Sequence, residues 1–400
     1  MNRAVLTRSL VAVAVAAALG GTTAVVLTSG SGSTTIQASG PTPAPAPAAV
    51  AQVEQAKGDT VPWDAPLRVS VANGTLTAVN VTGPDGATLD GTLGPTAWVS
   101  AITSLLPRAA YAVHVELVNG DGQASSFDRT VHAAAPKREL RPTVSPQGGT
   151  YGIGQPVIVR FNRPVKGEQA RRAVMDRLVV TTTPTVEGAW RWYNSYEIHY
   201  RGPAYWKPGT TISVSADLTG LRVPGTDTWG YPHVRTGGMT IGDALVGTVD
   251  VTAHTMTVTR NGKVVRTFNI SAGRKEFPTK GGVHIVLTRE KEHLYNSATI
   301  GIPTASPDGY YKKLPWSVRI SNGGAFVHAN PGTVRFQGET NVSHGCVNAS
   351  LEDAKWFYDN THLGDIVNVV NAVVGPTLWD AGMADWNYTW ATWQQGNLRG

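Results

Sequence analysis

Residues 343–348 read Ser-His-Gly-Cys-Val-Asn, and Cys346 within them is the only cysteine of the 400 residues. Serine, glycine and asparagine favour turns, whereas an inert buried thiol normally has apolar neighbours in a periodic pattern. Glycine at position 345 tolerates the dihedral angles that let successive backbone N–H groups point at one position, as an oxyanion hole requires. The hexapeptide therefore predicts a turn that presents Cys346 as a nucleophile.

A histidine lies eighteen residues before Cys346, at the end of the apolar stretch Gly324–His328. A neighbouring imidazolium lowers the pKa of a thiol from about 8.5 to roughly 3.5–7.5, and we expect His328 to act on Cys346 in this way. His328, His344 and Cys346 are also suitable zinc ligands. The zinc alternative stays open, although the sequence contains no His-Glu-x-x-His pattern.

Short strand patterns surround the turn over residues 243–372. Alternating apolar residues flank Asn261-Gly262, a dipeptide that favours a hairpin. Ser350 and Asp353 have the spacing of a capping box, and Gly364 suits the end of the helix that follows. Four further strands are expected at His284–Leu287, Trp316–Ile320, Ala325–His328 and Ile366–Val370. These patterns predict a β-rich domain with one short helix.

Two further sets of alternating strands lie on the N-terminal side of that domain. In residues 62–137, Tyr111 begins an alternation of apolar and polar residues that runs to Leu117. In residues 138–242, the same kind of pattern appears at Val157–Phe161 and again at Thr211–Ala216. Short strands at this spacing predict two immunoglobulin-like β-sandwiches. A single cysteine excludes an intrachain disulfide in either of them.

The N-terminal region has a different composition. Met1–Ser9 carries two arginines and no acidic residue, and Leu10–Leu19 is uninterrupted apolar sequence. This layout predicts a secretory signal peptide over residues 1–28, or a retained membrane anchor, and the choice stays open. Residues 29–61 are rich in Pro, Ala and Ser and are expected to form an extended linker.

The C-terminal residues 373–400 contain Trp386, Trp390 and Trp393 at the spacing of one helical face. We expect a short helix that packs on the β-rich domain, with a surface for stacking sugars as the alternative. The net charge of +6 favours anionic surfaces. It is too small in a chain of this length to indicate nucleic-acid binding.

His328 followed by Ser343–Asn348 resembles the signature of the L,D-transpeptidase catalytic domain. Supporting similarities lie in Phe277–Gly282, which lacks the second proline of the family's segment, in Ser306–Tyr310 and in Asp385–Asn387. The resemblance covers about residues 61–400. It implies a mainly β protein with two immunoglobulin-like modules, a catalytic domain and a Trp-rich C-terminal extension. The modules would serve as spacers or as wall-binding units.

The resemblance also implies roles for seven residues. Cys346 would be the nucleophile and His328 its base, held by the backbone carbonyl of Ala329. The N–H groups of Gly345 and Cys346 would hold the oxyanion, in a loop that His344 also shapes.

Three further residues would contact or orient the substrate in the family's scheme. Ser343 and Asn348 would orient the nucleophile loop and the donor peptide, and Tyr310 would face the acyl group from across the cleft. No metal or other cofactor is implied.

The reaction implied is the formation of 3→3 cross-links between peptidoglycan stem peptides, through a thioester on Cys346 and with release of D-Ala. The partners would be a tetrapeptide donor and a diamino-acid acceptor, with carbapenems as covalent inhibitors, at the cell envelope of an exported protein. Two rivals stay open: an L,D-carboxypeptidase on the same domain, and a non-catalytic wall-binding protein with a structural Cys346.

A lid is a further hypothesis. Residues 289–311 are long, polar and rich in turn-forming residues, and they precede the strand that ends at His328. Such a segment is suited to closing over a donor peptide. The alternative is an ordinary surface loop.

Overall fold

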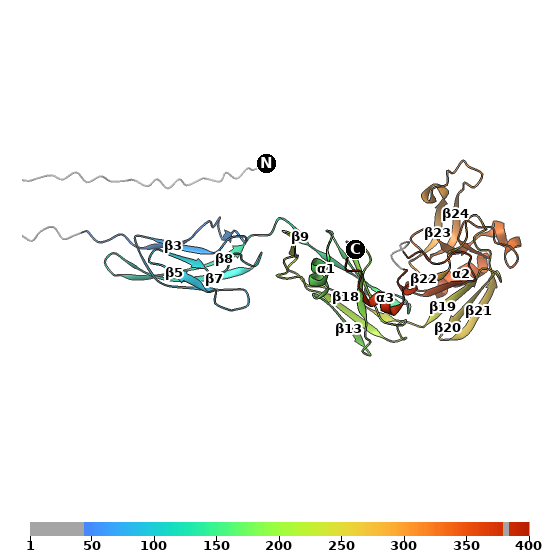
Figure 1. Ribbon diagram of the computed structural model, residues 1–400, viewed down its shortest axis with the longest axis horizontal. Coiled ribbons are helices and arrows are strands. Elements are labelled where there is room, and N and C mark those ends of the chain that lie inside the picture. The colour runs from blue at the N-terminus through green and yellow to red at the C-terminus, as the bar shows by residue number, and fades with distance from the viewer. Residues whose placement is uncertain (1–43, 379–383, 400) are drawn as a thin grey trace, which may run out of the picture. The chain divides into compact units, whose positions relative to one another are not determined.

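A computed structural model describes residues 44–378 and 384–399 of the chain (Figure 1). The predicted signal peptide or anchor, residues 1–28, lies outside the described residues. All the strands and helices of the described residues belong to one compact unit, Pro47–Gly400. Within the described part of the chain, no helix has the length and apolarity needed to cross a bilayer.

The first β-sandwich pairs a sheet of order β1-β3-β6-β5 with a sheet of order β2-β8-β7-β4. Strand β7 (Ala110–Asn119) shows the predicted alternation, because Tyr111, Val113, Val115 and Leu117 are buried between the sheets. The other strands are β1 (Val50–Val53), β2 (Thr60–Val61), β3 (Arg68–Ala72), β4 (Gly74–Thr82), β5 (Gly91–Leu93), β6 (Ala97–Ser100) and β8 (Ala124–Ala133).

The predicted linker, residues 29–61, extends too far toward the C-terminus. Strand β1 pairs antiparallel with β3, with Val50 opposite Ala72, and Val53 is buried in the sandwich. Strand β2 pairs with β8. The Pro/Ala-rich composition concealed a four-residue alternation that is long enough to add an edge strand.

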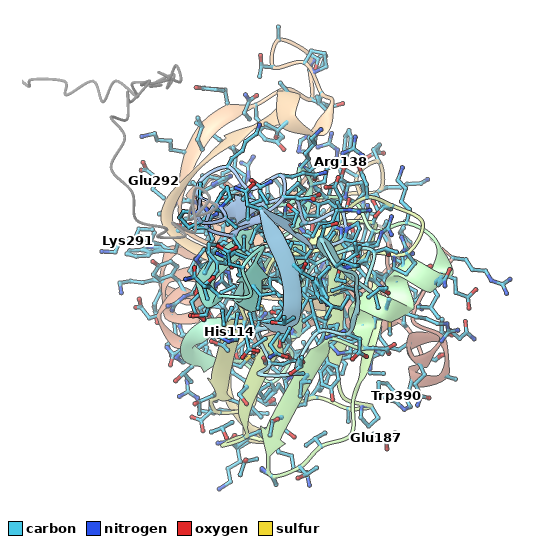
Figure 2. The ribbon with its side chains drawn as sticks, turned by 90° about the vertical axis from the view of Figure 1, so that its left-hand side faces the viewer. His114, Arg138, Glu187, Lys291, Glu292 and Trp390 are labelled. Carbon is cyan, nitrogen blue, oxygen red and sulfur yellow. The ribbon has the colours of Figure 1, made fainter. Side chains whose placement is uncertain are left out.

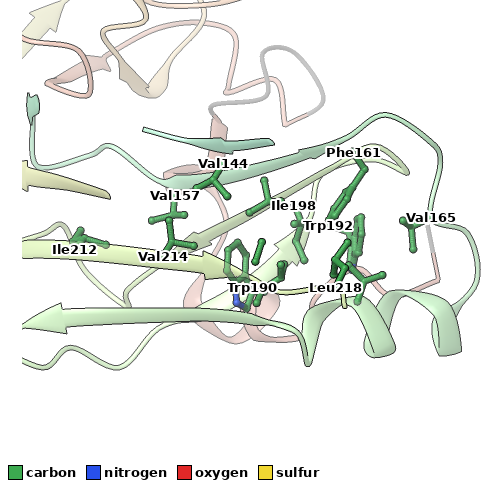
Figure 3. Close-up of a cluster of buried hydrophobic side chains, with 14 of the residues drawn as sticks. Val144, Val157, Phe161, Val165, Trp190, Trp192, Ile198, Ile212, Val214 and Leu218 are labelled. Atoms are coloured by element: carbon green, nitrogen blue, oxygen red, sulfur yellow. The ribbon is translucent and has the colours of Figure 1, made fainter. Parts of the chain in front are cut away.

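The second β-sandwich pairs the orders β10-β12-β15-β14 and β11-β18-β16-β13. Figure 3 shows its core, in which Phe161 and Trp192 stack at 5.5 Å between ring centroids. Its strands are β9 (Glu139–Leu140), β10 (Pro142–Ser145), β11 (Gln147–Tyr151), β12 (Val157–Phe161), β13 (Leu178–Thr183), β14 (Ala189–Trp192), β15 (Glu197–Arg201), β16 (Thr211–Ala216), β17 (Trp229–Gly230) and β18 (Arg235–Ile241). A helix that the sequence did not signal, α1 (Glu168–Met175), lies between β12 and β13.

The third domain contains a five-stranded sheet of order β21-β20-β19-β27-β22 and a four-stranded sheet of order β23-β24-β25-β26. The first sheet consists of β19 (Leu245–Asp250), β20 (Thr255–Arg260), β21 (Lys263–Asn269), β22 (Gly282–Ile285) and β27 (Ile366–Val370). The second sheet consists of β23 (Thr288–Asn296), β24 (Tyr311–Arg319), β25 (Phe326–Ala329) and β26 (Val347–Ala349). Two 3₁₀ turns, η1 (Ser297–Ile300) and η2 (Pro331–Phe336), follow β23 and β25. The predicted mainly β fold class is confirmed.

The predicted helix is α2 (Leu351–Asn360), and its first turn has the expected cap. Ser350 Oγ accepts a hydrogen bond from the backbone N–H of Asp353 at 3.0 Å. Ala354 and Phe357 are buried in the core of the third domain. The helix follows β26 directly, so it fixes one end of the turn that carries Cys346.

The second sandwich and the third domain share buried contacts. Ile285 and Ile366 of the third domain belong to the buried cluster of the second sandwich. The N–H groups of Gly152 and Gly154 donate to the carbonyls of Leu363 and Gly364 at 2.8 and 2.9 Å. These contacts join the second sandwich to the third domain through both side chains and backbone.

The C-terminal extension differs from its prediction in two ways. It forms a 3₁₀ turn, η3 (Ala384–Asn387), and a separate helix, α3 (Trp390–Gln394), rather than one helix. It packs on the second sandwich as well as on the third domain: Trp393 Nε1 donates to the carbonyl of Ala189 at 2.8 Å, and Asn387 Nδ2 donates to that of Val283 at 2.7 Å. Trp393 is buried and Trp386 and Trp390 are partly buried, but the spacing of the tryptophans does not say which domain covers them.

Candidate active site

Cys346 lies immediately before β26, and β26 pairs in parallel with β25, which carries His328. In this register His328 is opposite Asn348, so the turn and the end of β25 adjoin each other. Two cavities meet at Cys346. One is lined by residues that include Gly345 and Tyr310, and the other by residues that include His328 and Asn348.

The structure brings all the predicted site residues to these cavities. The cavity that His328 lines also contains Tyr310, Ser343, His344, Cys346 and Asn348. The other cavity contains Tyr310, His344, Gly345 and Cys346. Tyr310, His344 and Cys346 are therefore common to both.

The turn itself is held by the hydroxyl of Ser343. Ser343 Oγ accepts the N–H of Gly345 at 3.0 Å and donates to the carbonyl of Cys346 at 2.6 Å. Gly345 has a φ of +114°, a conformation that side chains with a Cβ rarely adopt. The amide of Gly345 is thus already engaged by Ser343, which contradicts the expectation that it points at an oxyanion. The N–H of Cys346 is the remaining predicted donor.

The thiol is packed among aromatic and aliphatic side chains. Cys346 is partly buried against Tyr295, Leu314 and Phe326. Its Sγ donates to the carbonyl of Gly324 at 3.6 Å. Burial raises the pKa of Cys346 to about 11, although a hydrogen bond from the backbone N–H of Phe326 opposes this rise.

His328 is almost completely buried. Its Nδ1 lies 2.9 Å from the carbonyl of Ala329, which fixes Nδ1 as the protonated nitrogen and leaves Nε2 as an acceptor. Burial lowers the pKa of His328 to about 4, and the bond to Ala329 offsets only part of that effect. Both shifts run opposite to the expected thiolate and imidazolium, because burial favours the uncharged form of each group. Cys346 and His328 line the same cavity, and the surrounding side chains favour the neutral form of both.

His344 connects the turn to Arg274, a residue that the sequence analysis did not single out as functional. Arg274 Nη1 lies 3.2 Å from His344 Nε2, and the same guanidinium forms an ion pair with Asp308. The rings of Phe277 and Tyr310 lie 4.7 and 5.1 Å from that of His344. Burial lowers the pKa of His344, and the charge of Arg274 lowers it further. No local sequence signal links Arg274 to the site, because Asp308 and His344 are 34 and 70 positions away from it.

Tyr295 was also missed. Its ring lies 4.7 Å from that of His328 and 5.1 Å from that of Phe326, and its hydroxyl donates to Ser317 Oγ at 2.9 Å. Strand alternation predicts that one face of β23 is buried, but it does not show that this face meets the histidine.

The predicted lid is smaller than expected. Residues 289–296 belong to β23 and pair with β24, with Asn296 opposite Tyr311, so the irregular part is limited to residues 297–310. Figure 2 shows Lys291 and Glu292 of β23 pointing away from the ribbon. Tyr310 is fixed by backbone and side-chain bonds to Ser297 at 3.0 Å each. The polar residues that suggested a lid lie largely on the exposed face of the hairpin formed by β23 and β24.

Within residues 44–378 and 384–399, no group of three or more His, Cys, Asp or Glu side chains is arranged to hold a metal ion. The three ligands of the zinc alternative therefore do not form such a group, since all of them lie in that range.

Comparison with known proteins agrees with this geometry. A family model described as a bacterial Ig domain matches residues 58–222, and one described as the L,D-transpeptidase catalytic domain matches residues 246–369. L,D-transpeptidase 2 of Mycobacterium tuberculosis (strain CDC 1551 / Oshkosh) is 37% identical over 346 residues, which are 86% of this chain and 83% of the relative.

Two further matches concern L,D-transpeptidase 1. The protein of Mycobacterium tuberculosis (strain ATCC 25618 / H37Rv) is 36% identical over 242 residues, covering 60% of this chain and 89% of the relative. A solved structure of LD transpeptidase LdtMt1 in complex with imipenem is 36% identical, with a TM-score of 0.50, over 59% of this chain and 100% of that chain. The chain described here therefore belongs to the L,D-transpeptidase family.

Proposed function

We propose that this protein is a peptidoglycan L,D-transpeptidase that forms 3→3 cross-links, with Cys346 as the nucleophile and His328 as the general base. Cys346 attacks the carbonyl of the third residue of a stem tetrapeptide and expels the terminal D-Ala. The resulting thioester is resolved by the side-chain amine of a diamino acid on a neighbouring stem. Family membership supports the transpeptidase activity, and the residue roles rest on the geometry of the site.

The observation that carries the proposal is the position of Cys346 between two cavities. An acyl transfer needs a donor on one side of the thioester and an acceptor on the other, whereas hydrolysis needs only water. The cavity that contains His328 is also lined by Arg274, Asp308 and Lys312. Charges of both signs suit a diamino acid, which carries amines and carboxyl groups. The presence of this charged cavity beside Cys346 thus favours transfer over the carboxypeptidase alternative.

The neutral resting pair determines how the proton moves. With the pKa of Cys346 at about 11 and that of His328 at about 4, a preformed ion pair is disfavoured. Transfer of the thiol proton to Nε2 of His328 therefore accompanies attack of the sulfur on the carbonyl carbon. The proton then passes to the nitrogen of the departing D-Ala, and the C–N bond breaks as the thioester forms.

The second half of the reaction reverses these transfers. The acceptor amine gives a proton to Nε2 of His328 as its nitrogen attacks the thioester carbon. The bond between the thioester carbon and the sulfur of Cys346 then breaks. The sulfur takes the proton from His328, so the enzyme returns to its starting state. The N–H of Cys346 is the proposed donor to the oxyanion in both halves, since Gly345 is engaged by Ser343.

The same pocket provides the proposed site for β-lactam inhibitors. The related structure of LdtMt1 is in complex with imipenem, and we expect imipenem to acylate Cys346 here. Such an enzyme acts on the cell wall, so we also propose that the chain is exported and that the segment 1–28 directs this export or anchors the protein.

Product analysis tests the proposal. The purified protein is incubated with a disaccharide tetrapeptide, and the products are separated and fragmented by mass spectrometry. Dimers linked between third residues, with one D-Ala released per link, are expected from the wild type and absent from Cys346→Ala. Tripeptide without dimers would replace the proposal by the carboxypeptidase alternative.

A further inference from the structure

The cavity on the Gly345 side of Cys346 has a wall that comes from outside the catalytic domain. Pro376 and Thr377, which follow β27, line it together with Ala384 and Asn387 of η3. The C-terminal extension therefore faces the same space as the thiol. Any displacement of η3 changes the shape of this space directly.

On the side of the catalytic domain, the wall packs against residues 281–283, which include Gly281 and Gly282. Asn387 forms two hydrogen bonds with the backbone of Val283, accepting its N–H at 2.8 Å and donating to its carbonyl at 2.7 Å. Gly281 donates its N–H to the carbonyl of Val374 at 2.8 Å.

The wall approaches the catalytic domain most closely at Gly282. It has a φ of +100°, and a Cβ there would lie 2.5 Å from Asn387 Oδ1 and 2.7 Å from Pro376 Cβ. The wall approaches the strand this closely only because residue 282 has no side chain.

On the other side, η3 is held by a buried ion pair in the second sandwich. Asp385 Oδ2 lies 2.8 Å from His199 Nδ1, and Glu197 Oε1 lies 2.7 Å from Nε2 of the same ring. His199 is 0% exposed and Asp385 is 3% exposed. Burial by itself lowers the pKa of His199, but Asp385 and Glu197 outweigh it and raise the pKa to about 9. The histidine is therefore charged at neutral pH and binds both carboxylates as ions.

The guanidinium of Arg201, which packs among aromatic rings, holds the residues that follow Asp385. Arg201 is 2% exposed and donates from Nη2 to the carbonyl of Tyr388 at 2.9 Å. Its guanidinium lies 4.6 Å from the ring centroid of Trp386 and 4.5 Å from that of Trp393. Together with the ion pair, this contact fixes both ends of the segment that contains Asn387.

We propose that His199 and Asp385 are positioning residues for substrate binding: they set the place of the cavity wall formed by η3, so that the second immunoglobulin-like domain determines the affinity of the catalytic domain for its donor peptide. Asp385 is adjacent to Ala384 and two residues from Asn387, both of which line the cavity. All three residues belong to the single 3₁₀ turn η3, so a few backbone bonds connect Asp385 to the residues that line the cavity. The inference rests on the proposed function in taking this cavity to bind the donor.

The experiment compares steady-state cross-linking by the full chain and its Asp385→Asn variant. Loss of the charge of Asp385 releases η3, and we expect the KM for the tetrapeptide donor to rise by at least about five-fold while kcat changes by less than about two-fold. His114→Ala is the matched control. It removes an exposed histidine that contacts Asp128 at 2.7 Å in the first sandwich, far in sequence from the wall, and we expect no change in KM.

Gly282→Ala displaces the same wall from the side of the catalytic domain and leaves the ion pair of His199 and Asp385 unchanged. This variant also replaces Asp385→Asn as the test if that protein does not fold. The expected result is again a raised KM. Concentrations of competent enzyme are determined by titration with imipenem, since a merely structural defect lowers the number of competent sites and leaves the KM unchanged. An unchanged KM in the variants that fold would overturn the inference.

The rate constant for acylation by imipenem gives a readout that does not depend on cross-linking. We expect it to fall in Asp385→Asn and in Gly282→Ala and to stay constant in His114→Ala. A wild type that is acylated but makes no dimers would overturn the proposed transpeptidation, and the variants would still test the wall through acylation. Equal acylation rates in all three variants and the wild type would overturn the positioning role.

Discussion

Two histidines in this protein are almost completely buried, and their surroundings give them opposite charge states. His328 in the third domain is 3% exposed, and His199 in the second sandwich is 0% exposed. Burial lowers the pKa of His328 to about 4, and the hydrogen bond between Nδ1 and the carbonyl of Ala329 offsets only part of that effect. Two carboxylates outweigh burial at His199 and raise its pKa to about 9.

The comparison shows that burial alone does not define the role of a histidine. A neutral imidazole with a free Nε2 accepts a proton from a neighbouring thiol, which is the task proposed for His328. A charged imidazole that already binds two carboxylates has no free nitrogen and acts as a structural cation. One histidine is suited to chemistry and the other to holding the C-terminal extension.

The largest expected effect is on catalysis at His328. Replacing His328 by Asn removes the proton acceptor, and we expect kcat/KM to fall by about 10²–10⁴-fold. The thermal midpoint is expected to change little, since no ion pair is lost. Kinetics and a thermal melt of the same preparation check both expectations. A variant with near wild-type kcat/KM would show that another group takes the thiol proton.

At His199 the expected effect is on stability. His199→Ala leaves Asp385 and Glu197 buried without their common partner, and removing one member of a buried ion pair costs about 3–5 kcal/mol. Urea denaturation, followed by the fluorescence of the tryptophans near the extension, measures this loss. The double variant His199→Ala/Asp385→Ala is expected to lose less than the sum of the single variants. Strict additivity would mean that the two side chains do not stabilise each other.

The smallest expected effect is a dependence of stability on pH. The folded state keeps the proton of His199 up to about pH 9, whereas the unfolded chain releases it near pH 6.5. The folded state therefore binds more protons in this window, and the free energy of unfolding falls as the pH rises from about 6.5 to 9.

The wild type and His199→Ala should accordingly differ most below pH 6.5 and converge above pH 9. Burial also raises the pKa of Asp365 to about 7, and that carboxyl affects both proteins equally as the pH rises toward 7. Denaturation curves at a series of pH values give the difference. A gap of constant size from pH 6 to pH 10 would contradict the assigned charge of His199.

Much of the proposed site was accessible from sequence because its signals are local. The turn-forming residues around Cys346, the apolar strand that ends at His328 and the cap at Ser350 each occupy a few consecutive positions. Local patterns of this kind reflect backbone conformation, and the structure follows them.

The parts that sequence reasoning missed depend on distant partners. His199 and Asp385 are 186 positions apart, and neither has a periodic neighbour that predicts the other. The thiol was expected to be acidic, but Tyr295 and Phe326 exclude water from it, and their packing is set by strand pairing across the sheet. The amide of Gly345 was expected to face an oxyanion, yet Ser343 two residues earlier accepts it. In each case the tertiary contact overrides the local expectation.

The central claim is that the sulfur of Cys346 is reached by a carbonyl and acylated. Intact-mass analysis after incubation with imipenem, followed by peptide mapping, tests it most directly. We predict a single adduct per chain, located on Cys346 and missing from Cys346→Ala. Unmodified wild-type protein, or an adduct on any other residue, would contradict the account.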